Sequence, residues 1–316
     1  MKPFRRNDGG KAYFRSLFCV PLFLIVGCFR TVPDNTERVF LASTFPVYQL
    51  VRNVTVGVPG VRVDLLLPAS TGCPHDYALT PQDRRKLESS DVLIINGLGL
   101  EEFMGPLLER SGLHVIDSSQ GLDDLLPLLE KHHEHGGKAS PSDVNPHLFV
   151  SPERSAQLAR VIAMGLSEVD PVHGDLFKKN ADIYAQRMGR WMEEFRTRRA
   201  RWPNTRVASL HNAFDYFLKD VGLTQVGVLQ IHPGQAPALS DIGGLVRLMK
   251  KTKTAVLITQ TQYSDRLGRT VSQEAGVPTV ALDAGANGPE NASLDYFETV
   301  LDQNLKNLDD ALKFRE

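Results

Sequence analysis

The hydrophobic residues of this chain fall into short continuous runs that alternate with amphipathic stretches from Arg38 onward. Continuous runs rich in Val, Ile and Leu are typical of strands buried on both faces of a parallel sheet. We expect strands at 39–43, 61–67, 91–96, 114–117, 206–210, 225–230, 255–259 and 279–282. The amphipathic stretches predict helices at 47–54, 101–111, 152–166, 171–201, 212–221, 240–251, 265–275 and 294–313. A further helix is expected after Thr80, a good N-cap residue that is followed by Pro81 and by Asp83 at the third helical position.

The longest helical stretch, Pro171–Arg201, carries one apolar stripe with spacings of three and four residues. Its members are Phe177, Ala181, Tyr184, Met188, Trp191 and Phe195. About thirty helical residues extend roughly 45 Å, which suits a helix that runs along two packed domains. We therefore predict an α/β protein of two lobes, each with a mostly parallel sheet flanked by helices, joined by one long rigid helix. The predicted N-terminal lobe is 38–168, the connecting helix 169–202 and the C-terminal lobe 203–316.

The first residues read as a targeting segment. Five Lys and Arg residues precede an apolar run over Leu17–Gly27, which is the outline of a signal peptide. The run ends in the sequence LIVGC at Cys28, which resembles a bacterial lipobox. We expect a signal peptide over 1–28, a lipid on Cys28 that anchors the protein to the membrane, and a polar linker over 29–37. A plain signal peptide cut elsewhere and a short uncleaved anchor are the alternatives.

Length and charge narrow the class of protein. The chain of 316 residues suits two domains on a prior of roughly 100–200 residues each. A formal net charge of −1 argues against a nucleic-acid binder. With Cys19 in the signal peptide and Cys28 lipidated, Cys73 alone remains, so no disulfide framework is expected. The segment 130–143 is polar and contains His132, His133 and His135, which indicates either a solvated surface loop or a weak metal-collecting segment.

Four residues lie where a metal site would need them: His75, His147, His211 and Asp283. His211 and Asp283 directly follow expected strands, His75 follows the strand over 61–67, and His147 precedes the helix that starts near 152. Ligands of open α/β sheets gather outside the carboxyl ends of the strands. Because two candidates fall in each half of the chain, a site between the lobes is expected.

Three imidazoles and one carboxylate fit a tetrahedral zinc site. With all four positions filled there is no vacancy for a catalytic water, which favours a carrier over an enzyme. Taken singly, each histidine reads as a surface or hydrogen-bonding residue, and Asp283 as a turn former. The interpretation depends on their combination, since HExxH, CxxC and dinucleotide-binding glycine patterns are absent from the sequence.

Several stretches together resemble the solute-binding proteins of bacterial zinc and manganese ABC transporters. The resemblance covers about 38–312 and is carried by PHDY at 74–77 with Thr80-Pro81, NGLGLE at 96–101, NPH at 145–147, SLHNAFDYF at 209–217, QYS at 262–264, EAGV at 274–277 and Leu282-Asp283. It implies two α/β lobes linked by one long helix. It also implies a zinc ligand set of His75, His147, His211 and Asp283, a monomer, and a permease and ATPase as partners, in an extracytoplasmic location. His at the third ligand position goes with zinc in this family, whereas Glu there goes with manganese.

The chain departs from the family pattern at four positions. Asn145 stands where Asp is usual and would orient His147 less strongly. Cys73 stands for a common Asp and is either inert or a competing soft ligand. Ala284 stands for Pro, and Gln260 for an acidic residue.

Other functions stay open at this point. They are a manganese or iron carrier on the same scaffold, a zinc hydrolase with Asp76 as its base, and a surface adhesin. Among the other histidines, His232 follows a strand end and could face the site, whereas His114 and His173 are expected to be structural or surface residues.

Overall fold

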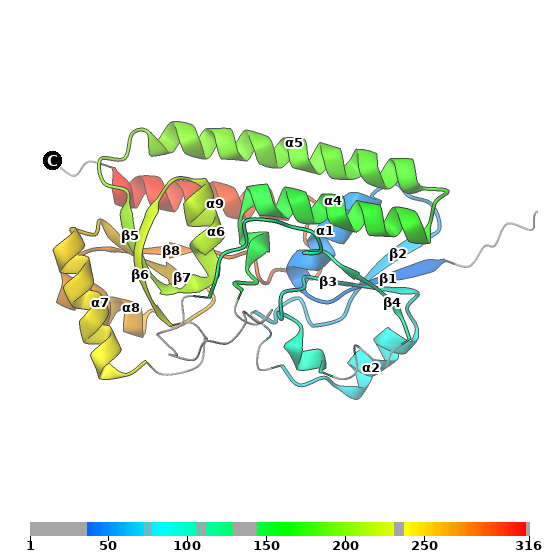
Figure 1. Cartoon of the computed structure of the whole chain (residues 1–316), viewed down its shortest axis with the longest axis horizontal. Coiled ribbons are helices and arrows are strands. Elements are labelled where there is room, and N and C mark those ends of the chain that lie inside the picture. The colour runs from blue at the N-terminus through cyan, green and yellow to red at the C-terminus, as the bar shows by residue number, and fades with distance from the viewer. Residues whose placement is uncertain are drawn as a thin grey trace, which may run out of the picture. The chain divides into compact units, whose positions relative to one another are not determined.

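Two four-stranded parallel sheets organise the computed structural model (Figure 1). The first has the strand order β2 (Val61–Leu65), β1 (Arg38–Ala42), β3 (Val92–Ile95) and β4 (His114–Asp117). The second has the order β6 (Thr224–Gln230), β5 (Arg206–His211), β7 (Val256–Gln260) and β8 (Thr279–Leu282). The structure describes residues 37–72, 74, 77–105, 108, 112–128, 144–230 and 237–313.

Helices connect the strands and flank the sheets. The α-helices of the described residues are α1 (Phe45–Thr55), α2 (Pro81–Glu88), α4 (Pro152–Val169), α5 (Gly174–Arg199), α6 (Asp215–Asp220), α7 (Leu239–Thr252), α8 (Arg266–Ala275) and α9 (Tyr296–Leu312). The described residues also form the short 3₁₀ helices η1 (Glu102–Met104), η3 (Leu148–Val150) and η4 (Asn212–Phe214). Two parallel α/β halves confirm the predicted fold class.

Successive side chains of a strand point to opposite faces of its sheet, so alternate residues of the central strands pack in two different hydrophobic clusters. Phe40 and Ala42 belong to the main cluster, whereas Leu41 between them packs in a smaller cluster on the opposite face of the sheet. The second sheet repeats this arrangement, with Val207 in the main cluster and Ala208 in a separate one. Each sheet is therefore buried on both faces, which explains the continuous apolar runs in the sequence.

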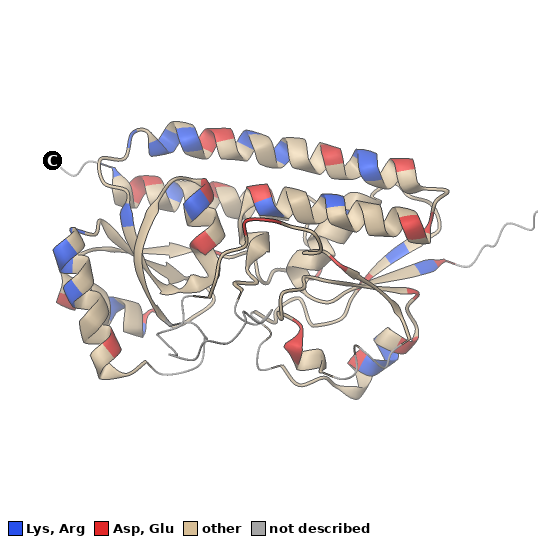
Figure 2. Ribbon diagram, viewed as in Figure 1, with Lys and Arg blue, Asp and Glu red and all other residues tan. Residues whose placement is uncertain are grey.

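Helix α5 runs along both halves and packs on α4, α1 and α9 (Figure 1). The apolar stripe predicted from the sequence is its buried face, although Trp191 is only half-buried. Figure 2 shows basic and acidic residues along the same helix, as expected of a helix with one face in solvent. No helix in the described part of the chain is long and apolar enough to cross a membrane. The predicted lobe boundaries at 168 and 202 stay predictions.

Most predicted helix ends lie within a few residues of the structure. Thr80 is the N-cap of α2, as predicted, and it forms a capping box with Asp83. The helix expected at 101–111 is wrong in its first part, where only η1 forms before Gly105 turns the chain at a φ of 47°. The residue before a proline avoids the α conformation, and Gly105 precedes Pro106. The helix expected at 212–221 begins as η4 and continues as α6, and strand β5 extends one residue further than predicted, to His211.

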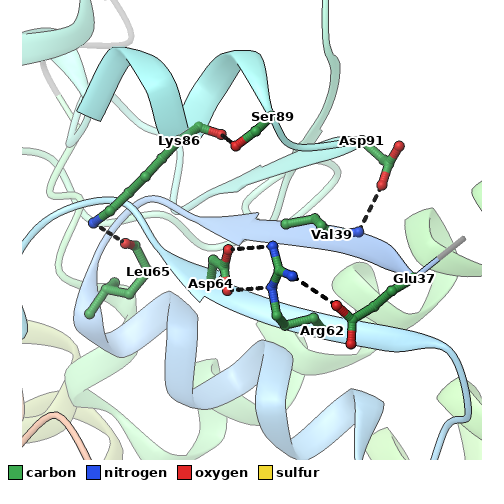
Figure 3. A network of polar contacts seen from close by, with 8 residues as sticks. All are labelled: Glu37, Val39, Arg62, Asp64, Leu65, Lys86, Ser89 and Asp91. Atoms are coloured by element: carbon green, nitrogen blue, oxygen red, sulfur yellow. Dashed lines mark hydrogen bonds and ion pairs between the residues drawn. The ribbon is translucent and has the colours of Figure 1, made fainter. Parts of the chain in front are cut away.

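The exposed edge of the first sheet is charged. Arg62 of the edge strand β2 makes two contacts with the Asp64 carboxylate, at 3.0 and 3.2 Å, and one with Glu37 at 2.8 Å (Figure 3). Nearby, Lys86 of α2 donates to the carbonyl oxygens of Leu65 and Leu66. Charged side chains on an edge strand discourage pairing with a second sheet, so this network protects the edge more than it stabilises the fold.

Candidate metal site

Both sheets reverse their strand order at a central pair of strands, and such a switch point is where α/β proteins bind ligands. In the second sheet the pair is β5 and β7, and His211 is the last residue of β5. Its backbone is extended, and the chain then turns into η4. The His211 side chain is buried, with 5% of the residue exposed. A strand end at the switch point thus positions this imidazole.

His147 comes from the other half of the molecule and lies beside His211. The two ring centroids are 5.1 Å apart and the rings stand edge to face at 83°. His147 is 2% exposed. Its segment is fastened to the first half by two hydrogen bonds, from Asn145 N to the Leu126 oxygen at 2.8 Å and from Asn96 Nδ2 to the Pro146 oxygen at 2.9 Å. The structure therefore brings together two of the four predicted ligands.

The tautomer of His147 is set by Asn145. The Asn145 Oδ1 atom accepts from the His147 backbone N–H at 3.0 Å and lies 2.8 Å from Nδ1. Because an amide oxygen only accepts, Nδ1 carries the proton, and the lone pair of the neutral ring belongs to Nε2. A hydrogen bond of this kind on the far nitrogen is the usual support of a metal-binding imidazole. The amide makes this bond, and the weaker orientation of His147 by a neutral residue than by Asp stays a prediction.

Asp283 directly follows β8, as predicted. Its Oδ1 atom accepts from Gln262 Nε2 at 2.5 Å and from the Gly285 backbone N–H at 2.7 Å. Asn304 of α9 holds the Asp283 backbone through two bonds, at 2.8 and 2.7 Å. The carboxylate is thus fixed on a rigid strand end.

The second sheet spaces the backbone of Asp283 from that of His211. Strand β7 separates β8 from β5, and two strand spacings amount to about 10 Å. The loop after β7 fills this interval, since Gln262 bonds Asp283 and the Tyr263 ring lies 6.5 Å from the His211 ring. Asp283 also lines a surface groove along α9, and neither His147 nor His211 is among the residues that line it. Asp283 and His211 therefore lie at the same carboxyl-end side of the second sheet, but the Asp283 carboxylate is not grouped with the two imidazoles.

Several predicted residues lie outside the described ranges: Cys28, Cys73, His75, Asp76, His132, His133, His135 and His232. Within the described ranges no three His, Cys, Asp or Glu side chains are grouped closely enough to hold a metal ion. His114 is exposed on β4, and His173 bonds Asp170 at the start of α5. Both fit the structural or surface roles expected of them.

Two buried acids near the strand ends were not recognised from the sequence. Burial raises the pKa of Asp215 to about 6, although hydrogen bonds from Gln225 and Asn145 act against it. Burial likewise raises the pKa of Glu101 to about 7, against hydrogen bonds from the Asn96 backbone, Ser43 and the Gly97 backbone. Both acids lie within apolar stretches of the sequence, and an acid in such a stretch is the sequence signal for a buried carboxyl group.

The family described as "Zinc-uptake complex component A periplasmic" matches residues 41–311 of this chain. The chain belongs to this zinc-uptake family. The High-affinity zinc uptake system protein ZnuA of Bacillus subtilis is 26% identical over 314 residues, covering 92% of this chain and 97% of that protein. The zinc-binding lipoprotein AdcA of Streptococcus pneumoniae is 26% identical over 294 residues, which are 91% of this chain. The chain spans only 58% of the length of AdcA.

Solved structures of solute-binding proteins have the same fold as this chain. The solute-binding protein FpvC of Pseudomonas aeruginosa, in complex with Mn²⁺, superimposes with a TM-score of 0.75 at 25% identity, covering 88% of this chain and 98% of FpvC. A crystal structure of ZnuA gives a TM-score of 0.72 at 24% identity, covering 88% of this chain and 100% of that one. These likenesses confirm two α/β halves joined along a long helix.

Proposed function

We propose that this protein is an extracytoplasmic receptor that captures Zn²⁺ between its two halves and delivers it to an ABC permease driven by an ATPase. His75, His147, His211 and Asp283 are the proposed ligands. The observation that carries the proposal is the pair of buried imidazoles, one from each half, with ring centroids 5.1 Å apart. Membership of the zinc-uptake family supports the same cargo.

The chemistry of the pair favours zinc. Imidazole suits zinc and other late divalent ions, whereas manganese prefers carboxylate and water oxygens. The bond from Asn145 gives Nε2 of His147 the lone pair that a metal needs. Asp283 lies apart from the histidine pair in the described structure, so it would have to move toward the pair when the metal binds. With Asp283 as the fourth donor the site would be closed, and the protein would act as a carrier and not as a hydrolase.

A manganese or iron carrier is the second candidate. The Iron-binding protein YfeA of Yersinia pestis is 26% identical over 247 residues, covering 77% of this chain and 76% of YfeA. Competition between Zn²⁺ and Mn²⁺ for the purified protein separates the candidates. Preferred binding of Mn²⁺ at equal free concentrations would contradict a zinc receptor.

Lipid on Cys28 is the proposed anchor, and the protein would act as a monomer on the outer side of the membrane. The LIVGC sequence and the lipoprotein name of AdcA support this anchor. Replacing Cys28→Ala should move the protein from the membrane fraction to the soluble extracytoplasmic fraction. An unchanged membrane fraction would contradict a lipid on Cys28.

The ligand set is tested by zinc titration of the His211→Ala variant against a chromophoric chelator. Loss of a direct ligand should weaken binding by more than the roughly 10–100-fold seen for outer partners of metal sites. His114→Ala is the matched control, because His114 is exposed on β4 of the other half. Unchanged zinc affinity in His211→Ala would refute the assignment.

A further inference from the structure

The Asn145 side chain links the two halves of the protein. On one side its Oδ1 atom faces the backbone N–H and Nδ1 of His147. On the other side its Nδ2 atom donates to the Asn212 carbonyl at 2.8 Å and to the Asp215 Oδ2 atom at 3.0 Å. All four residues are buried, so this chain of contacts is shielded from water.

The direction of the amide is decided by what lies on its nitrogen side. A carbonyl oxygen and a carboxylate oxygen both accept, so only the NH₂ group of Asn145 can face them. The amide oxygen must then face His147 and take the Nδ1 proton. Hydrogen bonds in a chain polarise one another, and a charged acceptor strengthens the chain more than a neutral one does. The Asp215 carboxylate therefore acts on His147 without touching it.

We propose that Asp215 is a positioning residue for metal binding, which acts through Asn145 to hold His147 in the tautomer with its lone pair on Nε2. This inference rests on the proposed function, and it assigns Asp215 a role in that site. An Asp at position 145 would place a negative charge directly beside the imidazole. In this protein the negative charge lies on the far side of Asn145, on Asp215 at the start of α6. Asn145 and Asp215 form a matched pair, since two carboxylates at their 3.0 Å separation would repel each other.

The matched pair makes a double-mutant cycle possible. Asp215→Ala removes one of the two acceptors that orient the amide, and zinc affinity should fall about 10-fold, within the range of outer partners of metal sites. Asn145→Asp places two carboxylates face to face and should weaken binding further. Asn145→Asp combined with Asp215→Asn moves the charge to position 145 and keeps a donor at 215, so binding should recover in part. Recovery is incomplete because the Asn212 carbonyl still faces an acceptor.

Zinc dissociation constants should be measured with a chelator for each variant, together with the ¹⁵N shifts of the His147 imidazole in the metal-free protein. Asp220→Ala is the matched control, because Asp220 is an acid of the same helix that bonds Ser151 and not Asn145. Wild-type protein and Asp220→Ala should show the Nδ1–H tautomer, whereas Asp215→Ala should show a mixture.

The outcomes separate the two claims. If wild type binds no zinc, or if His147→Ala binds as tightly as wild type, the proposed function fails. If His147→Ala is weak while Asp215→Ala matches wild type in zinc affinity and ¹⁵N shifts, the inference alone fails. A lower unfolding temperature of Asp215→Ala without either change would make Asp215 merely structural. A double variant no better than Asn145→Asp would overturn the coupling.

Discussion

The imidazole rings of His147 and His211 lie edge to face with their centroids 5.1 Å apart, although each is fastened to a different half of the protein. His211 ends a central strand of the second sheet, whereas the segment of His147 is bonded by Asn96 of the first half. The separation of the two rings thus reports how the halves pack.

Replacing His211→Glu should shift metal preference toward manganese. A carboxylate is a harder donor than an imidazole, so it suits Mn²⁺ better and Zn²⁺ less well. We expect the ratio of zinc to manganese affinity to fall by at least about tenfold, which corresponds to about 1.4 kcal/mol. Competition between the two ions measures the ratio, and His114→Glu serves as the exposed control. A ratio equal to that of wild type would speak against His211 as a ligand.

Glu101 should make the protein less stable as pH rises through neutrality. Burial raises its pKa from 4.5 to about 7, so the folded protein keeps a proton that the unfolded chain has released. The folded state therefore binds more protons between about pH 4.5 and 7, and the free energy of unfolding falls across that window. The stabilisation that the protonated Glu101 side chain contributes is complete below about pH 4.5 and is lost by about pH 7. At about 1.36 kcal/mol per pKa unit, the loss is on the order of 3 kcal/mol.

Denaturant midpoints from pH 5 to 8 test this dependence. Asp215 and Asp220, whose pKa values burial raises to about 6, add to the same trend. Glu101→Gln stays neutral at every pH, so its stability should vary less steeply with pH than that of wild type. Glu102→Gln is the control, because Glu102 is the exposed neighbour. Parallel pH curves for wild type and Glu101→Gln would contradict the prediction.

Gly288→Ala should destabilise the contact between the two halves. The Gly288 N–H donates to the Ala69 oxygen at 3.0 Å, and a Cβ atom here would lie 2.4 Å from the Phe45 ring and 2.9 Å from Tyr296. One side must move, and overpacking of this kind costs about 1–3 kcal/mol. Urea denaturation should show that loss. Gly244→Ala, where nothing lies within 4 Å of the added carbon, should show none, and equal effects of the two changes would count against a steric cause.

Much of the fold was predictable because its determinants are local. Strands β4 and β8 have the predicted bounds, and Thr80 caps α2 as predicted, since such signals depend on a few neighbouring residues. The helix predicted over 101–111 does not begin at Glu101, because the chain turns at Gly105, directly before Pro106. Tight turns at glycine override periodicity, and Gly97 shows this too, at a φ of 87° where a Cβ would lie 2.0 Å from the Asp117 carboxylate.

The sequence by itself determined the two α/β halves, the long apolar stripe of α5 and the strand ends at which His211 and Asp283 lie. These follow from periodicity and from the geometry of parallel sheets. Only the tertiary structure decided that His147 meets His211 and that Asn145 reaches Asp215 in the other half. Such contacts depend on how the two sheets dock, and that docking arises from many weak packing contacts in the hydrophobic cluster that both halves share with α4, α5 and α9. The role of His75 as a ligand stays a prediction from the sequence.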